Sequence, residues 1–297
     1  MKKGLTLLCL GLVLCACGRQ TSGVKHIVVI GCDGFGAYAY HKAEMPNLKR
    51  LAADGAWSVK VRTVLPSSSA VNWASILLGA GPTLHGYTEW NSRVPEIPSA
   101  AISQYGKFPS IYTLLKEQLP QSKTAVVYSW DGIEFLLETD IIDFVIPTHA
   151  DEDLAADTAA IIIKREKPTF TFIHFDDVDH VGHHIGHDTP EYYAALTQFD
   201  ARIGRVVQAV KDAGIESETV IMLVSDHGGV GKGHGEKSLL EVETPFVISG
   251  AGIKKGHEIE GVVIDYDFAA TMAQIFNLQT PQAWRGKAIE EVFATNK

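Results

Sequence analysis

Short apolar runs alternate with longer amphipathic segments along most of this chain. The apolar runs are rich in Val, Ile and Phe, which is typical of buried strands, and they predict strands at 27–30, 124–128, 144–147, 169–175, 220–225 and 245–249. The intervening segments repeat apolar residues at helical spacing and predict helices at 45–54, 72–78, 111–118, 151–164, 191–213 and 265–276. This alternation predicts an α/β fold with a largely parallel central sheet flanked by helices.

Residues 1–16 differ in character from the rest of the chain. A positive start is followed by an apolar run that is too short to span a bilayer and that fits a secretory signal peptide. Leu14-Cys15-Ala16-Cys17 resembles the lipobox of bacterial lipoproteins. We therefore expect a lipoprotein signal peptide over 1–16, a lipid on Cys17 and a polar tether over 17–24. The protein would be exported and anchored to a bacterial membrane, facing the periplasm or the cell exterior. An ordinary signal peptide is the alternative.

Residues 25–297 show no internal repeat, low-complexity tract or linker rich in Pro, Gly and Ser, so we expect one domain there. The stretch 87–106 is the least regular part and is the best candidate for an inserted loop that faces a substrate. The net charge of −9 gives no support for binding of a nucleic-acid duplex, which usually requires a basic patch. After cleavage only Cys17 and Cys32 remain, so no intramolecular disulfide is expected.

Acidic side chains follow three of the predicted strands. Asp33 comes shortly after 27–30, Asp179 after 169–175 and Asp226 directly after 220–225. Ligands of open α/β sheets bind at the carboxyl ends of the strands. These three positions can therefore converge on one site although they lie far apart in the sequence.

The segment around Asp179 is dense in side chains that bind metals. Five of the twelve histidines of the chain lie between residues 174 and 187. Asp179 and His183 are four residues apart, which places both on one side of a helical turn or tight loop, and Gly182 between them adds backbone freedom. The pattern predicts a metal site, and a surface histidine run without function is the alternative.

A second group, Asp226-His227, is followed by a glycine-rich stretch that contains His234. Adjacent Asp and His side chains can both reach a metal where the backbone turns sharply, which the glycines permit. A glycine-rich turn with incidental polar residues is the alternative.

The segment Gly34-Phe35-Gly36-Ala37-Tyr38-Ala39 matches the looser form of the dinucleotide-binding fingerprint, and Asp54 follows about twenty residues later. Two observations count against that function. Asp33 would place a carboxylate beside the pyrophosphate, and Asp54 ends a predicted helix rather than a second strand.

Five short motifs occur in a characteristic order: Asp33-Gly34, Pro66-Ser67-Ser68-Ser69-Ala70-Val71-Asn72, Asp179-x-x-Gly182-His183, Asp226-His227-Gly228 and His234-Gly235. From about Lys25 to the C-terminus the chain resembles the alkaline phosphatase superfamily, and within it the type I phosphodiesterase and nucleotide pyrophosphatase branch. The resemblance implies an alkaline phosphatase-like fold with a metal site at the carboxyl ends of the strands. It also makes 25–297 a single catalytic domain.

The resemblance implies two Zn²⁺ ions, with Mn²⁺ as an alternative metal. Asp179, His183 and His234 would bind the first ion, and Asp33, Asp226, His227 and the nucleophile Ser69 the second. In the phosphodiesterase branch the nucleophile is usually threonine, followed after two residues by asparagine; Ser69 and Asn72 occupy these positions. Ser67 and Ser68 are rival nucleophiles by position, and the spacing to Asn72 favours Ser69. The Asn72 side chain and the Ala70 amide would donate to the phosphate oxygens.

The implied function is hydrolysis of a small-molecule phosphoester, with a nucleotide as one candidate, through a phosphoseryl intermediate. A phosphodiesterase or nucleotide pyrophosphatase is favoured; a phosphomonoesterase is the alternative, and a metal-binding surface lipoprotein without activity is a remote one. Trp73, Tyr87 and Trp90 are candidates for stacking on a nucleobase. Lys232 and Arg93 are candidates for a contact to the phosphate in a phosphomonoesterase, and Lys232 is the better of the two. The Cys/Ser-x-Pro-x-Arg motif of sulfatases is absent.

Overall fold

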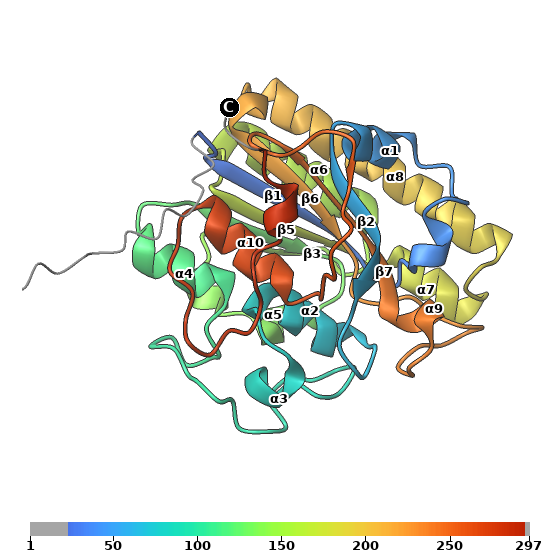
Figure 1. The fold of residues 1–297 in the computed structure, drawn as a ribbon, viewed down its shortest axis with the longest axis horizontal. Coiled ribbons are helices and arrows are strands. Elements are labelled where there is room, and N and C mark those ends of the chain that lie inside the picture. The colour runs from blue at the N-terminus through green and yellow to red at the C-terminus, as the bar shows by residue number, and fades with distance from the viewer. Residues whose placement is uncertain (1–22, 295–297) are drawn as a thin grey trace, which may run out of the picture.

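The structure is a computed structural model and describes residues 23–294 (Figure 1). The predicted signal peptide, the predicted lipidation site Cys17 and residues 17–22 of the predicted tether lie outside the described residues. Within the part that is described, no helix combines the length and the apolar character needed to cross a membrane.

Eight strands form one sheet in the order β4-β3-β5-β1-β6-β7-β2-β8 (Figure 1). Their bounds are β1 His26–Cys32, β2 Gly55–Arg62, β3 Thr124–Tyr128, β4 Phe144–Pro147, β5 Phe170–Phe175, β6 Thr219–Val224, β7 Glu243–Gly250 and β8 His257–Glu258. β4, β3, β5, β1 and β6 pair in parallel, whereas β7 runs antiparallel to both β6 and β2. The predicted α/β fold with a largely parallel sheet is confirmed. The predictions did not include β2 or the short β8.

The helices are α1 Pro46–Ala53, α2 Ser69–Leu78, α3 Pro82–His85, α4 Ile111–Gln118, α5 Ile133–Leu136, α6 Glu152–Glu166, α7 Asp177–His184, α8 Pro190–Asp212, α9 Leu239–Val242 and α10 Asp267–Ile275. All six predicted helices are present. Helix α7 and the single-turn helices α3, α5 and α9 were not predicted. The stretch 87–106 contains neither helix nor strand.

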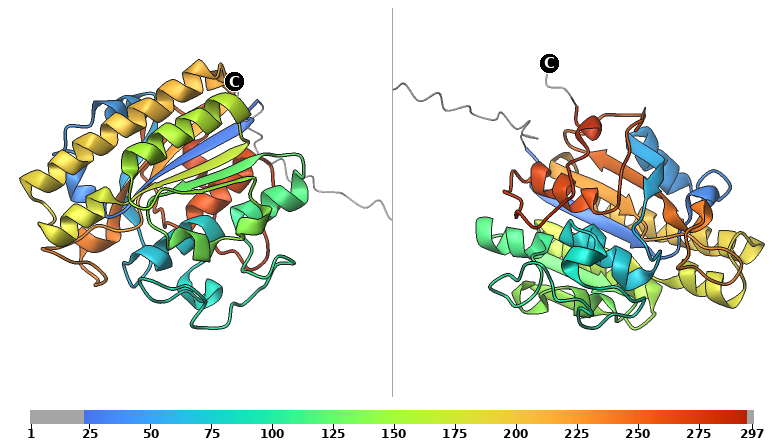
Figure 2. Two further views of the ribbon diagram at one scale, coloured as in Figure 1. Left: turned by 180° about the vertical axis from the view of Figure 1, so that it is seen from behind. Right: turned by 60° about the horizontal axis from the view of Figure 1, so that its bottom comes forward.

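Two hydrophobic cores cover the two faces of the sheet. Alternate residues of β1 serve each face, since Ile27 and Val29 pack with α2, α4 and α10, whereas Val28 and Ile30 pack with α1, α6 and α8. Figure 2 shows α6 and α8 lying side by side across the second face. A strand buried on both faces must be apolar throughout, which explains why β1 reads as a continuous apolar run.

Helix α2 is fully buried along its length, from Ser69 to Leu78. It begins after Ser68, whose backbone is extended, and ends at Gly79, which adopts a left-handed conformation with φ of 63°. The fold thus buries the helix that carries Ser69 against the middle of the sheet.

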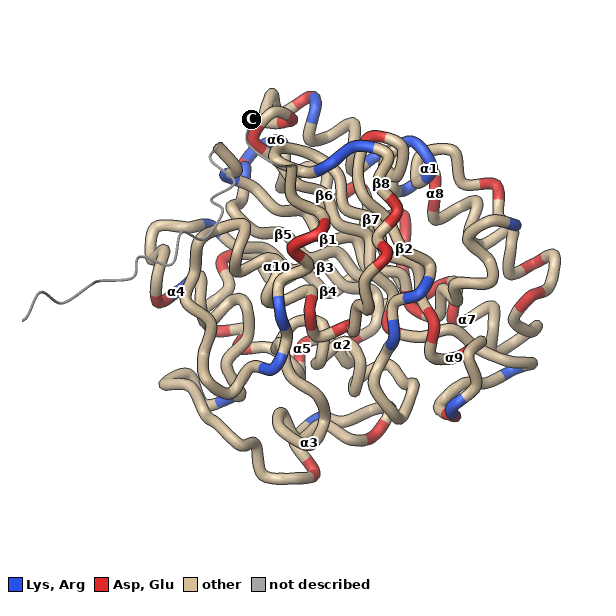
Figure 3. The backbone as a smooth tube through the Cα atoms, viewed as in Figure 1, with Lys and Arg blue, Asp and Glu red and all other residues tan. Residues whose placement is uncertain are grey.

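Lys and Arg positions are spread over the chain in the view of Figure 3 rather than gathered in one stripe.

Candidate active site

Three neighbouring strands, β5, β1 and β6, carry the candidate ligands at their carboxyl ends. Asp33 directly follows β1, Asp226 and His227 follow β6, and Asp179 lies on α7, which begins just after β5. Because these strands are adjacent and parallel, their ends meet at one edge of the sheet. The structure therefore brings together the clusters that the sequence separates.

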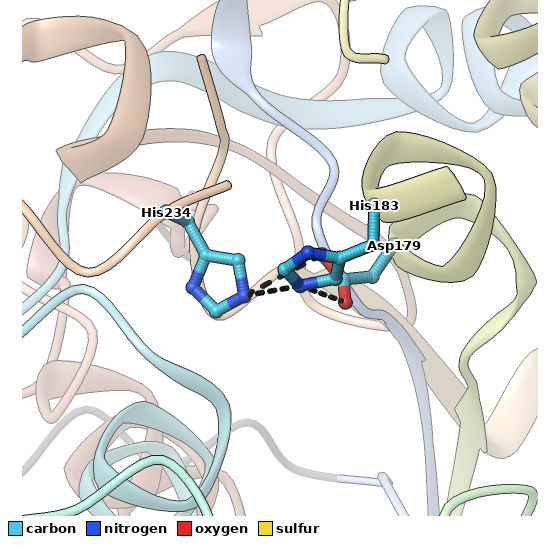
Figure 4. A group of neighbouring side chains, drawn as sticks. All are labelled: Asp179, His183 and His234. Carbon is cyan, nitrogen blue, oxygen red and sulfur yellow. Dashed lines mark hydrogen bonds and ion pairs between the residues drawn. The ribbon is translucent and has the colours of Figure 1, made fainter. Parts of the chain in front are cut away.

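The first ligand group consists of Asp179, His183 and His234, whose ligand atoms all lie within 4.8 Å of one another (Figure 4). The Nε2 atoms of the two histidines are 2.9 Å apart, and His183 Nε2 lies 3.3 Å from a carboxylate oxygen of Asp179. The opposite ring atoms contact backbone carbonyls. His183 Nδ1 lies 3.0 Å from the Lys232 carbonyl, and His234 Nδ1 lies 2.9 Å from the Ser67 carbonyl.

The second group consists of Asp33, Asp226 and His227, which are all completely buried. His227 Nε2 lies 3.3 Å from Asp33 Oδ1 and 3.2 Å from Asp226 Oδ2. Its Nδ1 donates to the carbonyl of Gly228 at 2.9 Å. The ring is therefore held by the backbone so that Nε2 faces both carboxylates.

The hydrogen bonds at Nδ1 decide where the imidazole protons lie. A carbonyl oxygen only accepts, so Nδ1 must carry a proton in all three ligand histidines. Burial, followed by the charge of His234, lowers the pKa of His227 to about 4, so this imidazole is neutral at pH 7 and its Nε2 lone pair faces two carboxylates. The hydrogen bond to Asp179 raises the pKa of His183 to about 9. In the second group, the neutral imidazole of His227 and two carboxylates thus turn lone pairs toward one another and require a positive charge between them. In the first group, a proton on His183 supplies that charge when no cation is bound.

The carboxylates of the two groups also require a positive charge nearby. Asp33 Oδ1, Asp179 Oδ1 and Asp226 Oδ2 are buried, and none has a hydrogen-bond partner among the described residues. A buried carboxylate oxygen without a donor is costly unless a cation compensates it. Three carboxylates and three imidazoles form an oxygen and nitrogen donor set that suits Zn²⁺. The residues present fit two divalent cations.

Ser69 is the first residue of α2, and its hydroxyl lies 3.3 Å from His227 Nε2. The two rival serines are placed differently. Ser67 donates to the Glu236 carbonyl at 2.6 Å, and the hydroxyl of Ser68 is buried without a partner among the described residues. Of the three hydroxyls, only that of Ser69 contacts a candidate metal ligand.

Both donors expected at the phosphate are engaged within the protein. The Asn72 amide nitrogen donates to the carbonyls of Pro66 and Ser68 at 3.1 and 3.0 Å, and its oxygen accepts from the Val64 amide at 2.9 Å. The Ala70 amide donates to the Trp90 carbonyl at 3.2 Å. In this arrangement Asn72 holds the segment that precedes Ser69 in place.

Two side chains hold Asp33 in place. The Trp73 indole nitrogen donates to Asp33 Oδ2 at 2.9 Å, and His174 Nε2 lies 3.2 Å from the same oxygen. Burial raises the pKa of Asp33, but the hydrogen bond from His174 and the neighbouring imidazoles outweigh it, so the pKa of this carboxyl lies well below its usual range. His174 belongs to the histidine run, but no sequence pattern indicated its contact with Asp33. It also forms a third close group with Asp33 and Asp176.

A cavity of about 730 Å³ opens beside Ser69 and the first ligand group. Among the candidate substrate contacts, Trp90 lines this cavity and is 61% exposed, whereas Trp73, Tyr87 and Lys232 are not part of the described lining. Tyr87 is buried and its hydroxyl donates to the Phe135 carbonyl, and the Lys232 ammonium donates to the His184 carbonyl. The lining also includes Trp130, which the sequence did not single out.

Comparison with known proteins agrees with this geometry. The family model for type I phosphodiesterase / nucleotide pyrophosphatase matches residues 27–236. The chain is 23% identical to mouse ectonucleotide pyrophosphatase/phosphodiesterase family member 1 over 216 residues, which cover 68% of this chain and 24% of the relative. It is also 23% identical to the venom phosphodiesterase of Macrovipera lebetinus over 220 residues, which cover 68% and 25%. The aligned region thus spans about a quarter of the length of these relatives.

Among solved structures, an inactive variant of murine ectonucleotide pyrophosphatase / phosphodiesterase 5 in complex with AMP is similar in fold, with a TM-score of 0.73 and 12% sequence identity. The alignment covers 91% of this chain and 100% of that one. Since the family model extends over most of the chain and includes all the candidate ligands, the chain belongs to the type I phosphodiesterase/nucleotide pyrophosphatase family.

Proposed function

We propose that this protein hydrolyses a phosphodiester or pyrophosphate bond of a small molecule, with Ser69 as the nucleophile. The observation that carries the proposal is the position of the Ser69 hydroxyl, 3.3 Å from His227 Nε2 and on the wall of the cavity that also exposes Asp179, His183 and His234. The AMP bound by the similar murine protein supports a phosphoester substrate, and a nucleotide is one candidate.

Asp179, His183 and His234 would hold one divalent cation, and Asp33, Asp226, His227 and Ser69 the other. Zn²⁺ fits the donor set best, and Mn²⁺ is the alternative. When bound, the two cations would lower the pKa of the Ser69 hydroxyl and offset the negative charge that develops on the phosphate.

The chain's own part in the reaction is nucleophilic. Ser69 Oγ loses its proton to water and forms a bond to phosphorus while the bond between phosphorus and the leaving alcohol oxygen breaks. The leaving oxygen takes a proton from water. A second water then attacks phosphorus, the bond to Ser69 Oγ breaks, and the hydroxyl regains a proton. One water is consumed for each ester bond cleaved, through a phosphoseryl intermediate.

Asn72 acts in this scheme as a positioning residue. Its three hydrogen bonds to the backbone of Val64, Pro66 and Ser68 fix the turn that leads into Ser69. A nucleophile that is held in one place before substrate binds needs less reorganisation to reach phosphorus.

The charge of the cavity favours a diester over a monoester. No Lys or Arg belongs to the described lining, whereas the carboxylates of Glu89 and Asp176 do. A phosphate monoester carries more negative charge than a diester and needs more cationic contacts from the protein. We also assign the irregular stretch 87–106 of the catalytic domain to the substrate side, because Glu89 and Trp90 from this stretch line the cavity.

We further propose that the enzyme is an exported lipoprotein, held on a bacterial membrane by a lipid on Cys17. The lipobox-like Leu14-Cys15-Ala16-Cys17 supports this location. Mass spectrometry of the N-terminal peptide would show the lipid. A Cys17→Ala protein that stays in the membrane fraction would contradict the proposal.

The activity is tested with zinc-loaded protein on bis(4-nitrophenyl) phosphate and on 4-nitrophenyl phosphate. We expect the diester to be the better substrate. Ser69→Ala should lower turnover by at least about a thousandfold while two zinc ions still bind, and Ser68→Ala should change turnover by only a few-fold. Retained activity in Ser69→Ala would move the nucleophile elsewhere. A preference for the monoester would favour a phosphomonoesterase, and no turnover of either ester with zinc bound would leave a metal-binding lipoprotein.

A further inference from the structure

Helix α7 carries two pairs of side chains that can bind a metal, both at a spacing of four residues. Asp179 and His183 form one pair and belong to the first ligand group. His180 and His184 repeat the spacing one position later and belong to none of the close ligand groups among the described residues. Positions four apart lie on one face of a helix, so each pair can converge on one point beside α7. The proposed hydrolysis makes no use of the second pair.

The second pair faces the same cavity as the first. His180 and His184 are both exposed, and both line the cavity of about 730 Å³ that opens beside the first ligand group. A shift of one residue is a rotation of about 100° about the helix axis, so the centres of the two pairs lie roughly 8–10 Å apart. A cation at the second pair would therefore be a neighbour of the first ligand group without sharing a ligand atom with it.

The imidazoles of His180 and His184 already lie against each other. Their ring centroids are 4.0 Å apart, and the ring planes are inclined by only 25°. Rings that stack so closely can each turn one nitrogen toward a common ion by small rotations of the side chains. Two histidines four residues apart on a helix are the pair that zinc-binding helices use.

A backbone hydrogen bond determines which nitrogen of His184 is free. Its Nδ1 lies 2.9 Å from the His180 carbonyl, which only accepts, so Nδ1 carries the proton and Nε2 keeps its lone pair. Histidines that bind metals usually hold the other ring nitrogen in this way. The Lys232 ammonium donates to the backbone carbonyl of His184 and has no described contact with the ring. The His184 ring is thus oriented as an Nε2 ligand.

The ring of His180 has no other partner to give up. Within residues 23–294 its nitrogens form no hydrogen bond or ion pair, and its one ring contact on the cavity side is the stacking on His184. The charges around the pair favour a cation. Glu89 and Asp176 belong to the described lining of the cavity, whereas no Lys or Arg does.

We propose that His180 and His184 form an accessory site for a transition-metal cation of the Zn²⁺ class on the wall of the cavity. The two imidazoles supply two ligands, and water completes the coordination. With only two protein ligands, this site binds more weakly than the three-residue groups and fills after them. Imidazole ligands favour Zn²⁺, Cu²⁺ and Ni²⁺ over Mg²⁺ and Ca²⁺. The site does not depend on the proposed hydrolysis.

The test counts the Zn²⁺ ions that the protein binds. Calorimetry follows the titration of metal-free protein with Zn²⁺ at pH 7.5, and competition with a chromogenic chelator measures the tightly bound ions. We expect one ion that binds more weakly than the rest. His180→Gln and His184→Gln should each lower the affinity for this ion at least about tenfold and leave the tightly bound ions in place. Mg²⁺ added to the zinc-loaded protein should not occupy the site.

Two further variants show whether the histidines share one ion. The double variant His180→Gln, His184→Gln should bind the weak ion about as poorly as either single variant, because a shared ion is released when one of its two ligands is lost. His41→Gln removes an exposed imidazole outside the cavity lining, so the weak ion should bind as in the wild type.

Four results would overturn the accessory site. The first is a wild-type protein that binds no weak Zn²⁺ ion, and the second is a weak ion that both single variants retain. The third is an additive loss in the double variant, which would indicate two independent histidines. The fourth is loss of a tightly bound ion in either single variant, which would make the pair a support of the first ligand group. None of these results depends on turnover, so the proposed hydrolysis is tested separately.

Discussion

The indole nitrogen of Trp73 donates a hydrogen bond to Asp33 Oδ2 at 2.9 Å, in the interior of the protein. This contact links the helix that carries Ser69 to a carboxylate that follows the central strand β1. It leaves Oδ1, the oxygen that faces His227, free for a cation. The orientation of a candidate ligand is thus set by a residue of the helix that begins with Ser69.

Trp73→Phe should therefore weaken zinc binding. The ring remains but the donor is lost, so Asp33 is held only by His174, and we expect zinc affinity to fall about tenfold. Trp284→Phe is the matched control, because the Trp284 indole donates to the Pro109 carbonyl at 2.8 Å in another part of the core. Both variants should lose about 1–2 kcal/mol of unfolding free energy. Competition with a chromogenic chelator measures the affinity, and equal zinc affinity in both variants would contradict the role of Trp73.

The glycine-rich loop that follows His227 packs closely against the imidazole of His187. A Cβ at Gly229 would lie 2.2 Å from His187 Nε2, whereas a Cβ at Gly233 would meet nothing within 4 Å. We expect Gly229→Ala to displace the loop and lower zinc affinity at least about tenfold, while Gly233→Ala has little effect. The double variant Gly229→Ala, His187→Ala should recover part of the loss. Failure of the second change to restore any affinity would mean that the clash is not the cause.

Zinc binding should release a proton from His183. Its hydrogen bond to Asp179 raises its pKa to about 9 in the metal-free protein, so below that pH a proton occupies the imidazole that the metal needs. The apparent zinc affinity should fall by about tenfold for each pH unit from 9 to 7, since proton and metal compete. Calorimetry in two buffers of different ionisation enthalpy counts the protons. His183→Gln should release one fewer, and an unchanged count would contradict this assignment.

Glu152 should make the metal-free protein less stable as the pH rises. Burial, followed by the charge of Asp177, raises its pKa from 4.5 to about 7, so the folded state holds a proton that the unfolded state has lost between these values. The free energy of unfolding should then decrease by roughly 1–3 kcal/mol from pH 4.5 to pH 7 through this group. Urea unfolding in the presence of EDTA measures it. Glu152→Gln should remove this part of the slope, and parallel curves for both proteins would refute the prediction.

The parallel part of the sheet was predictable from the sequence, because strands buried on both faces, such as β1 and β5, are apolar throughout. Strand β2 was missed for the converse reason. It pairs antiparallel to β7, and Ser58 and Lys60 interrupt its apolar pattern. The segment of helix α7 was predicted only as a helical turn or tight loop, because Asp and His have low helix propensity and formation of the full helix depends on the surrounding structure.

The candidate ligands came together as their strand-end positions led us to expect, but the surroundings could not be read from the sequence. Helix α2 is buried on every side, so its periodicity does not indicate which residues face the site. This is why Trp73, which supports Asp33 from the interior, was grouped with substrate contacts. The partners of Asn72 and Lys232 depend on loop conformations that spacing does not determine.

The order of strands in the sheet also sets when metal can be taken up. Ile27 of β1 pairs with Phe170 of β5 and with Val220 of β6. Both neighbours of the central strand β1 are therefore synthesised long after β1 itself. Such long-range parallel pairing is slow to form. A nascent chain that ends before His234 lacks part of the first ligand group, whatever else has folded. A cation can therefore be held by the complete first group only after most of the sheet has been synthesised, whereas the second group, which ends at His227, is complete earlier.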